Sequence, residues 1–255
     1  MAKSAKNLEC FAQFQSACVE QGFVQRGDSF FRVIGDGVFQ VLKYQYQRVG
    51  PHYSLDMGLF SMYGELQKSW FTSLGCIPRY SVMHLIGWRS TLRPNAIDSI
   101  NNCNILPYDQ WYVTPEEQLE VLLIKGFPFL DSIKTQKDLV EAMCYLDTVH
   151  WGGNVHWNDP LKLEPFLYSG ESKNAIKVID SILDQHCSAI QSWKEYFSPE
   201  QALQMQEEQE KNDQYFIAKR RMILEGNYQD IEEFLETNYK ANCKHARFCM
   251  SNREC

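Results

Sequence analysis

The spacing of apolar residues changes near Trp111, and no other feature constrains the fold of this chain as strongly. Before this point, three segments have the pattern of antiparallel strands. Residues 29–34 and 38–48 are rich in β-branched and aromatic residues, and residues 52–63 alternate between apolar and polar side chains. After it, apolar residues recur three and four positions apart, as on one face of a helix. The sequence therefore predicts an α+β fold with the strands first and most helices after them.

We expect this change to divide the chain into two domains. Residues 1–112 would form an α+β domain, a helix packed on an antiparallel β-meander, and residues 113–255 an all-helical domain of about five to seven helices. The boundary is poor in glycine and proline and carries the bulky Trp111 and Tyr112. We therefore predict a rigid junction in which these two aromatic side chains are packed.

Glycines mark the end of a predicted helix and a predicted turn in the first segment. The pattern of residues 8–21 predicts an amphipathic helix that ends before Gly22. Its apolar face would carry Leu8, Phe11, Phe14, Cys18 and Val19. The turn Gly35-Asp36-Gly37 joins the first two strands, where glycine supplies the positive φ of a β-hairpin. Asp36 would repel a phosphate, so we interpret this turn as structural. Residues 70–111 give a mixed signal, with 81–88 a short strand or a helix.

Helix caps are recognisable in the second segment. Thr114-Pro115-Glu116-Glu117 has the pattern of a capping box for a helix that we expect to end at Lys125-Gly126, and Ser198-Pro199-Glu200-Gln201 repeats the device. Thr135 can cap a third helix, with Leu139, Met143 and Leu146 on its apolar face.

A weak repeat with an offset of 56 residues relates residues 166–179 to residues 223–235. In each copy a helix ends at a glycine and another begins soon after, which is typical of stacked helical hairpins similar to tetratricopeptide packing. The alternative, that common amphipathic patterns coincide, has equal weight.

Residues 30–41 (FFRVIGDGVFQV) follow the first amphipathic helix and precede residues 59–63 (LFSMY). This arrangement resembles the bacterial domain of unknown function 4304 over about the first 110 residues, and the helical remainder resembles the extension that some members carry. The resemblance implies a bacterial α+β domain. It assigns no activity, and no catalytic residue carries over from it.

Charge is distributed unevenly along the chain. Residues 1–113 carry 10 Lys and Arg against 8 Asp and Glu, whereas residues 114–255 carry 15 against 24. This acidic helical segment argues against nucleic-acid binding, which depends on basic residues that neutralise phosphates. It is suited to a protein partner that is basic or neutral.

The chain has no membrane or secretion signal in its pattern. No aliphatic run exceeds the four residues from Val121 to Ile124, and the first ten residues lack the apolar core of a secretory leader. We therefore expect no membrane association and a cytoplasmic location. In that reducing compartment the nine scattered cysteines would be free thiols packed as small apolar side chains.

The segment from His150 to Asp159 is the strongest candidate for chemistry. His150, His156 and Asp159 flank a Gly-Gly turn and could form a metal or general-base site, since imidazole and carboxylate groups bind zinc, iron and manganese. Their spacing matches no established metal motif. The alternative is an interhelical loop anchored by its tryptophans.

The C-terminal segment holds a second possible metal group. Cys243, His245, Cys249 and Cys255 lie within thirteen residues, and His245 and Cys249 would share one helix face. The alternative is a plain helix end, whose basic side chains complement the negative end of the helix dipole. We predict no bound metal at either segment and no cofactor.

Tyr44 and Tyr46 alternate along the second strand and point to one face of the sheet. They lie either in the core or on an exposed protein-binding face, and we favour the core. The polar run at residues 204–214 is expected to be a solvated helix.

No signature of a P-loop, a dinucleotide-binding loop, a zinc protease, an α/β-hydrolase or a thioredoxin is present. Together with the acidic charge and the helical hairpins, this favours a non-enzymatic protein-interaction factor of the immunity or adaptor type. The alternative is a metal-dependent hydrolase that uses His150, His156 and Asp159.

Overall fold

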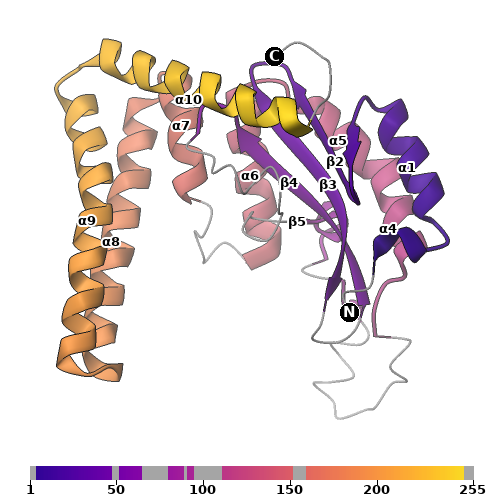
Figure 1. The fold of residues 1–255 in the computed structure, drawn as a ribbon, viewed down its shortest axis with the longest axis horizontal. Helices are drawn as coiled ribbons and strands as arrows, with labels where there is room; N and C mark the ends of the chain where they lie inside the picture. Colours follow the sequence, from indigo (N-terminus) through magenta and orange to yellow (C-terminus); the bar gives the residue numbers. More distant parts are fainter. Residues whose placement is uncertain are drawn as a thin grey trace.

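The structure is a computed structural model that describes residues 4–47, 52–64, 80–88, 91–94, 111–151 and 159–249. One antiparallel sheet has the order β1-β2-β3-β4-β5, with strands β1 (Val24–Arg26), β2 (Ser29–Ile34), β3 (Val38–Gln47), β4 (His52–Ser61) and β5 (Tyr80–Ser81). The helices are α1 (Phe11–Glu20), α4 (Pro115–Val121), α5 (Phe127–Ser132), α6 (Gln136–Trp151), α7 (Leu163–Tyr168), α8 (Ser172–Tyr196), α9 (Pro199–Leu224) and α10 (Tyr228–Cys249). The predicted α+β fold is confirmed, with helices placed as Figure 1 shows.

The three predicted strands form the centre of the sheet. Ile34 pairs with Val38 across the hairpin turn, and Gly35 and Gly37 both have positive φ, as predicted. Strands β3 and β4 pair along ten residues each. The short edge strand β1 was not predicted, because three residues carry too little alternation to stand out. Residues 81–88, expected to form a short strand or a helix, contain the end of β5 and then a 3-10 helix, Val82–Ile86.

Both faces of the sheet are covered. Phe30, Leu42 and Leu55 point to one face and share the largest apolar cluster with α1, α4 and α6. Phe39 and Phe60 point to the other face, where α10 supplies Cys243 and Ala246. Figure 1 shows α10 lying across the sheet on this side.

The apolar clusters do not divide at residue 112. Leu119, Met143 and Leu146 of the helical segment pack in the same cluster as Phe14 and Leu42 of the first segment. A separate cluster joins helices α7 to α10. The helical segment therefore completes the core of the sheet with its first three helices and builds a core of its own with the last four.

The predicted junction is held by backbone hydrogen bonds and ring stacking. Arg93 donates its N–H to the carbonyl of Trp111, and Tyr112 stacks on His52 at 3.9 Å between ring centroids. Tyr112 also forms an isolated β-bridge with Leu92. The two aromatic residues are half-buried.

The capping boxes at Thr114 and Ser198 form as predicted, and Thr135 accepts a hydrogen bond from the N–H of Asp138. The expected helix end at Gly126 is wrong. A π-helical turn, Leu122–Gly126, carries the chain directly from α4 into α5, and Gly126 keeps a helical φ of −66°. The wider turn accommodates Pro128, which has no N–H to donate.

Two smaller expectations also differ from the structure. Val19, expected on the apolar face of α1, is 55 % exposed because the helix buries only the narrower stripe Phe11, Phe14 and Cys18. The repeat correctly marks helix ends at Gly170 and Gly226, both with positive φ, but it does not identify the long hairpin. That hairpin is formed by α8 and α9, while α10 turns away to the sheet (Figure 1).

None of the helices that the structure describes combines the length and the apolar composition that a membrane span requires.

Candidate functional site

The predicted tyrosines do not form an open binding face. Tyr44 is 1 % exposed, and its hydroxyl donates a 2.6 Å hydrogen bond to the carbonyl of Pro115 at the start of α4. Its ring lies edge-on to Phe14. Tyr46 is half-buried and packs edge-on against Tyr53. Tyr44 is therefore a core residue that no partner can reach.

The candidate hydrolase residues lie largely outside the described part of the chain. His150 is the penultimate residue of α6 and Asp159 begins a 3-10 turn, Asp159–Lys162, but the side chains of both are outside the description, as is all of His156. Within the described ranges, no group of three or more His, Cys, Asp or Glu side chains is placed to hold a metal ion. The hydrolase alternative stays a prediction.

The candidate metal ligands near the C-terminus differ in how far they are buried. Cys243 is 8 % exposed and packs in the apolar cluster that joins α10 to the sheet, which is the role expected of a small apolar side chain. His245 is half-buried two residues further on. Cys249 ends α10, with its side chain outside the described set, and Cys255 is outside it altogether.

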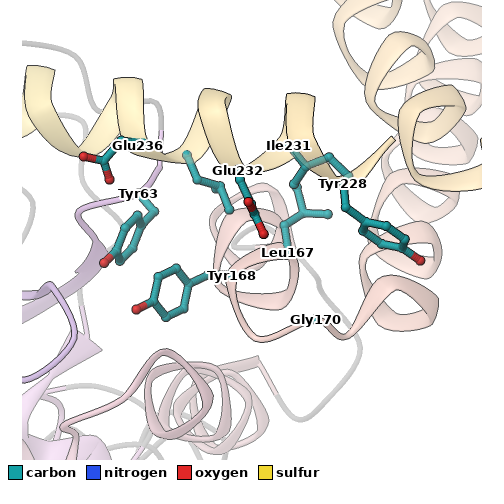
Figure 2. Close-up of a pocket in the computed structure, with 9 residues that line it drawn as sticks. Tyr63, Leu167, Tyr168, Gly170, Tyr228, Ile231, Glu232 and Glu236 are labelled. Carbon is teal, nitrogen blue, oxygen red and sulfur yellow. The ribbon is translucent and has the colours of Figure 1, made fainter. Parts of the chain in front are cut away.

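A groove of about 490 Å³ lies between α7 and α10, at the end of strand β4. Leu167, Ile231 and Leu235 form its apolar floor. Around this floor stand three tyrosines and two carboxylates, together with the backbone of Gly170; they are Tyr63, Tyr168, Tyr228, Glu232 and Glu236. Figure 2 shows the side chain of Glu232 pointing from α10 toward α7.

Hydrogen bonds from α10 to the end of β4 fix one wall of the groove. Asn242, 2 % exposed, donates from Nδ2 to the carbonyls of Met62 (2.8 Å) and Gly64 (2.7 Å). Asn238 donates in the same way to the carbonyl of Tyr63. Because these amides satisfy carbonyls beyond the last strand pair, they hold Tyr63 at a set distance from α10.

Three tyrosine rings pack against one another at this wall, and we call them the tyrosine stack: Tyr63 is stacked on Tyr239 and tilted against Tyr168. The ring of Tyr63 lies 4.1 Å from that of Tyr168 and 5.0 Å from that of Tyr239, both between centroids. Burial and a hydrogen bond with Tyr168 raise the pKa of Tyr63 above its ordinary value. Its phenol is therefore neutral at physiological pH. The stack presents Tyr168, which is 42 % exposed, as an aromatic surface at this end of the groove, while Tyr228 stands at the other end (Figure 2).

The charge in the groove is negative. From Tyr228 to Tyr239, α10 contains four Asp and Glu residues and no Lys or Arg. Glu236 pairs with Lys240 at 3.2 Å, an exposed contact along the same helix. Glu232 forms no ion pair with any residue that the structure describes. Its carboxylate is thus available to a ligand.

Aromatic faces next to carboxylates suit a cationic ligand, because a ring attracts a cation over its face and a carboxylate accepts charge-assisted hydrogen bonds. The same region already contains one such contact. The ammonium group of Lys219 lies over the rings of Phe234 on α10 and Tyr215 on α9. Among the residues that the structure describes, the lining includes no histidine, cysteine or serine. The groove is therefore equipped to bind an ammonium or guanidinium group.

Sequence reasoning identified neither Tyr168 nor Glu232 as a site residue. The only local signal was the pair of helix stops at Gly170 and Gly226, each two residues from a tyrosine. Comparison of the chain with protein-family models, with curated proteins and with solved structures gives no match. The resemblance to the bacterial domain of unknown function 4304 stays a prediction.

Proposed function

We propose that this protein is a non-enzymatic interaction factor of the adaptor type, and that its α7–α10 groove binds a basic segment of a protein partner. The observation that carries the proposal is the combination of Glu232, free of ion pairs among the described residues, with the exposed ring of Tyr168 and the apolar floor of the groove. An arginine or lysine side chain would place its aliphatic stem on this floor and its charge at the carboxylate.

The charge of the chain supports the same class of partner. Residues 114–255 carry nine more acidic than basic residues, and the groove lies in this segment. Such a field attracts a basic partner and raises its rate of association at low salt. It also repels the phosphate backbone of a nucleic acid.

Fluorescence anisotropy with a fluorescein-labelled hexa-arginine peptide tests the proposal. We expect the peptide to bind the wild-type protein, with an affinity that falls as salt is raised, and a hexa-glutamate peptide not to bind. Glu232→Gln should weaken binding about tenfold, since a hydrogen bond to a charged group is worth about 1.5–3 kcal/mol. Tyr168→Ala should weaken it about two- to fivefold through the lost aromatic face.

The control is Glu233→Gln, which removes the same charge one residue further along α10, from an exposed position that does not line the groove. If Glu232→Gln and Glu233→Gln lower the affinity equally, binding reflects the overall acidity of the helix and not the groove. Absence of binding by the wild-type protein would refute the proposal outright.

A further inference from the structure

Helices α8 and α9 form an arm that projects from the rest of the molecule, as Figure 1 shows. With 25 and 26 residues, each helix is about 38 Å long. The half of the arm near the α8–α9 turn packs only on itself in the described structure, and large apolar side chains there are exposed, with Leu203 at 57 % and Tyr196 at 79 %.

One stripe of α9 makes the contact with α8. Gln209 and Asp213 both hydrogen-bond to His186 of α8, and Arg220 forms an ion pair with Asp180 at 2.7 Å. Ala202 and Ile223 are buried at the two ends of this stripe. This face of α9 therefore carries the described polar contacts with α8 and two buried apolar side chains.

A second stripe runs parallel to the first, one residue further round the helix, and it faces solvent. Its members follow each other at alternating spacings of four and three, the spacing of a helix–helix contact: Leu203, Glu207, Glu210, Gln214, Ile217, Arg221 and Leu224. All seven are exposed. The three aliphatic members are 57 %, 37 % and 60 % exposed, which is unusual for side chains repeated at this spacing on a helix.

The stripe is complementary to its own reverse. Turning α9 end for end about Gln214 places Leu203 level with Leu224 and Glu207 level with Arg221, to within one residue. Neither Glu207 nor Arg221 forms an ion pair within the described residues. Glu210 comes level with Ile217 in this arrangement, and these two residues do not match.

The whole arm shows the same reversal of charge. Its base, residues 172–182 and 214–224, carries five basic residues and one acidic residue. Its outer part, residues 183–213, carries two basic and seven acidic residues. A second arm lying in the opposite direction therefore brings each acidic end beside a basic base, whereas a parallel arm brings like charges together.

We propose that this surface binds a second copy of the chain, with the two α9 helices antiparallel about a two-fold axis near Gln214. A two-fold interface requires a self-complementary patch, and the stripe meets that requirement through its Leu203–Leu224 and Glu207–Arg221 pairs. Each dimer contains the Glu207–Arg221 pair twice. This inference is independent of the groove, whose lining residues are not part of the stripe.

Sedimentation velocity of the full chain over about 1–200 μM tests the inference, and charge reversal gives it a sharp form. We expect the wild-type protein to dimerise in this range. Glu207→Arg and Arg221→Glu should each weaken the dimer at least tenfold, because each variant creates two like-charge contacts. The double variant should restore it, since the pairs form again with their signs exchanged.

Glu208→Arg is the matched control, an identical charge change at the adjacent exposed position outside the stripe, and it should leave the dimer within about twofold of wild type. Circular dichroism confirms that each variant is folded. A monomer at every concentration overturns the inference. So does a dimer that is indifferent to both single reversals, or a double variant that stays as weak as the single ones.

Discussion

Replacing Gly35 by alanine tests how the β2–β3 hairpin is joined to the helices. Gly35 has a φ of +51°, and an added Cβ would lie 1.8 Å from the carbonyl oxygen of Lys134, which precedes α6. The neighbouring N–H of Asp36 donates to that same oxygen at 2.8 Å. Gln136 in turn donates from Nε2 to the carbonyl of Asp36 at 2.6 Å. The substitution therefore forces the turn away from α6 and breaks this pair of hydrogen bonds.

The expected loss of unfolding free energy has two parts. A residue with a Cβ in the left-handed region costs about 1–2 kcal/mol. Separation of the turn from Lys134 loses two hydrogen bonds, each worth about 0.5–1.5 kcal/mol, and so costs about 1–3 kcal/mol more. We expect Gly35→Ala to lower the free energy of unfolding by about 2–5 kcal/mol, a large share of the total for a domain of ordinary stability.

Gly22→Ala is the matched control, because Gly22 has a φ of +78° but an added Cβ there meets no atom within 4 Å. It should cost only the backbone part, about 1–2 kcal/mol. Urea unfolding followed by tryptophan fluorescence and far-ultraviolet circular dichroism measures both variants against wild type. If the two variants differ by less than about 0.5 kcal/mol, the close contact between the turn and Lys134 contributes nothing, and the reasoning fails.

Three further predictions concern buried and ionised groups. Tyr44→Phe should lower the free energy of unfolding by about 0.5–1.5 kcal/mol, because it removes the 2.6 Å hydrogen bond from the buried phenol to the half-buried carbonyl of Pro115. In the folded protein, a disulfide reagent at pH 8 should react quickly with the exposed Cys187 and slowly with Cys18, whose pKa is raised by burial. Cys187→Ser should therefore lower the number of rapidly reacting thiols by one, and Cys18→Ser should leave that number unchanged. Burial alone would raise the pKa of Glu117, but hydrogen bonds from Arg93 and Thr114 outweigh it and hold the pKa below its usual 4.5. The ion pair therefore adds stability above pH 4.5 that is lost as the pH falls further, and Glu117→Gln should flatten the acid branch of the stability curve by about 0.5 kcal/mol for this half-exposed group. An equally steep acid branch in both proteins would contradict this assignment.

Features of the fold that depend on neighbours in the sequence were predictable. Strand β2 begins and ends at Ser29 and Ile34 as expected, because the glycine turn fixes one end and the alternation fixes the face. The capping boxes at Thr114 and Ser198 form because each needs only four consecutive residues. The apolar face of α6 was likewise predictable from the spacing of its apolar residues, and Leu139 on that face is fully buried.

Features that depend on partners far along the chain were not predictable. Gln118 is fully buried: its Oε1 accepts from the N–H of Leu55, and its Nε2 donates to the carbonyl of Tyr53, so that an amide completes the junction of α4 with β4. Arg32 crosses from β2 to Asp131 at 2.6 Å in the same way. In the sequence both are ordinary polar residues at a strand or helix position, and no spacing marks them as core. The contribution of both segments to one apolar cluster follows from these links and not from the change of period at residue 112.

The candidate groove escaped prediction for the same reason, and helix α10 shows why. One side of α10 carries Asn242 and Cys243, which attach it to the end of β4 and to the sheet. The same face carries Glu232 about three turns nearer the N-terminus, where it lines the groove. Since a single helix supplies both, the contacts that hold it to the sheet also set the distance from Glu232 to the tyrosine stack at Tyr63. The capacity of the groove to bind a cation thus depends on where α10 lies. Acidic residues near a helix N-terminus are common, because they interact favourably with the helix dipole in any protein. Here Glu232 becomes a binding residue only because α10 is held beside the tyrosine stack.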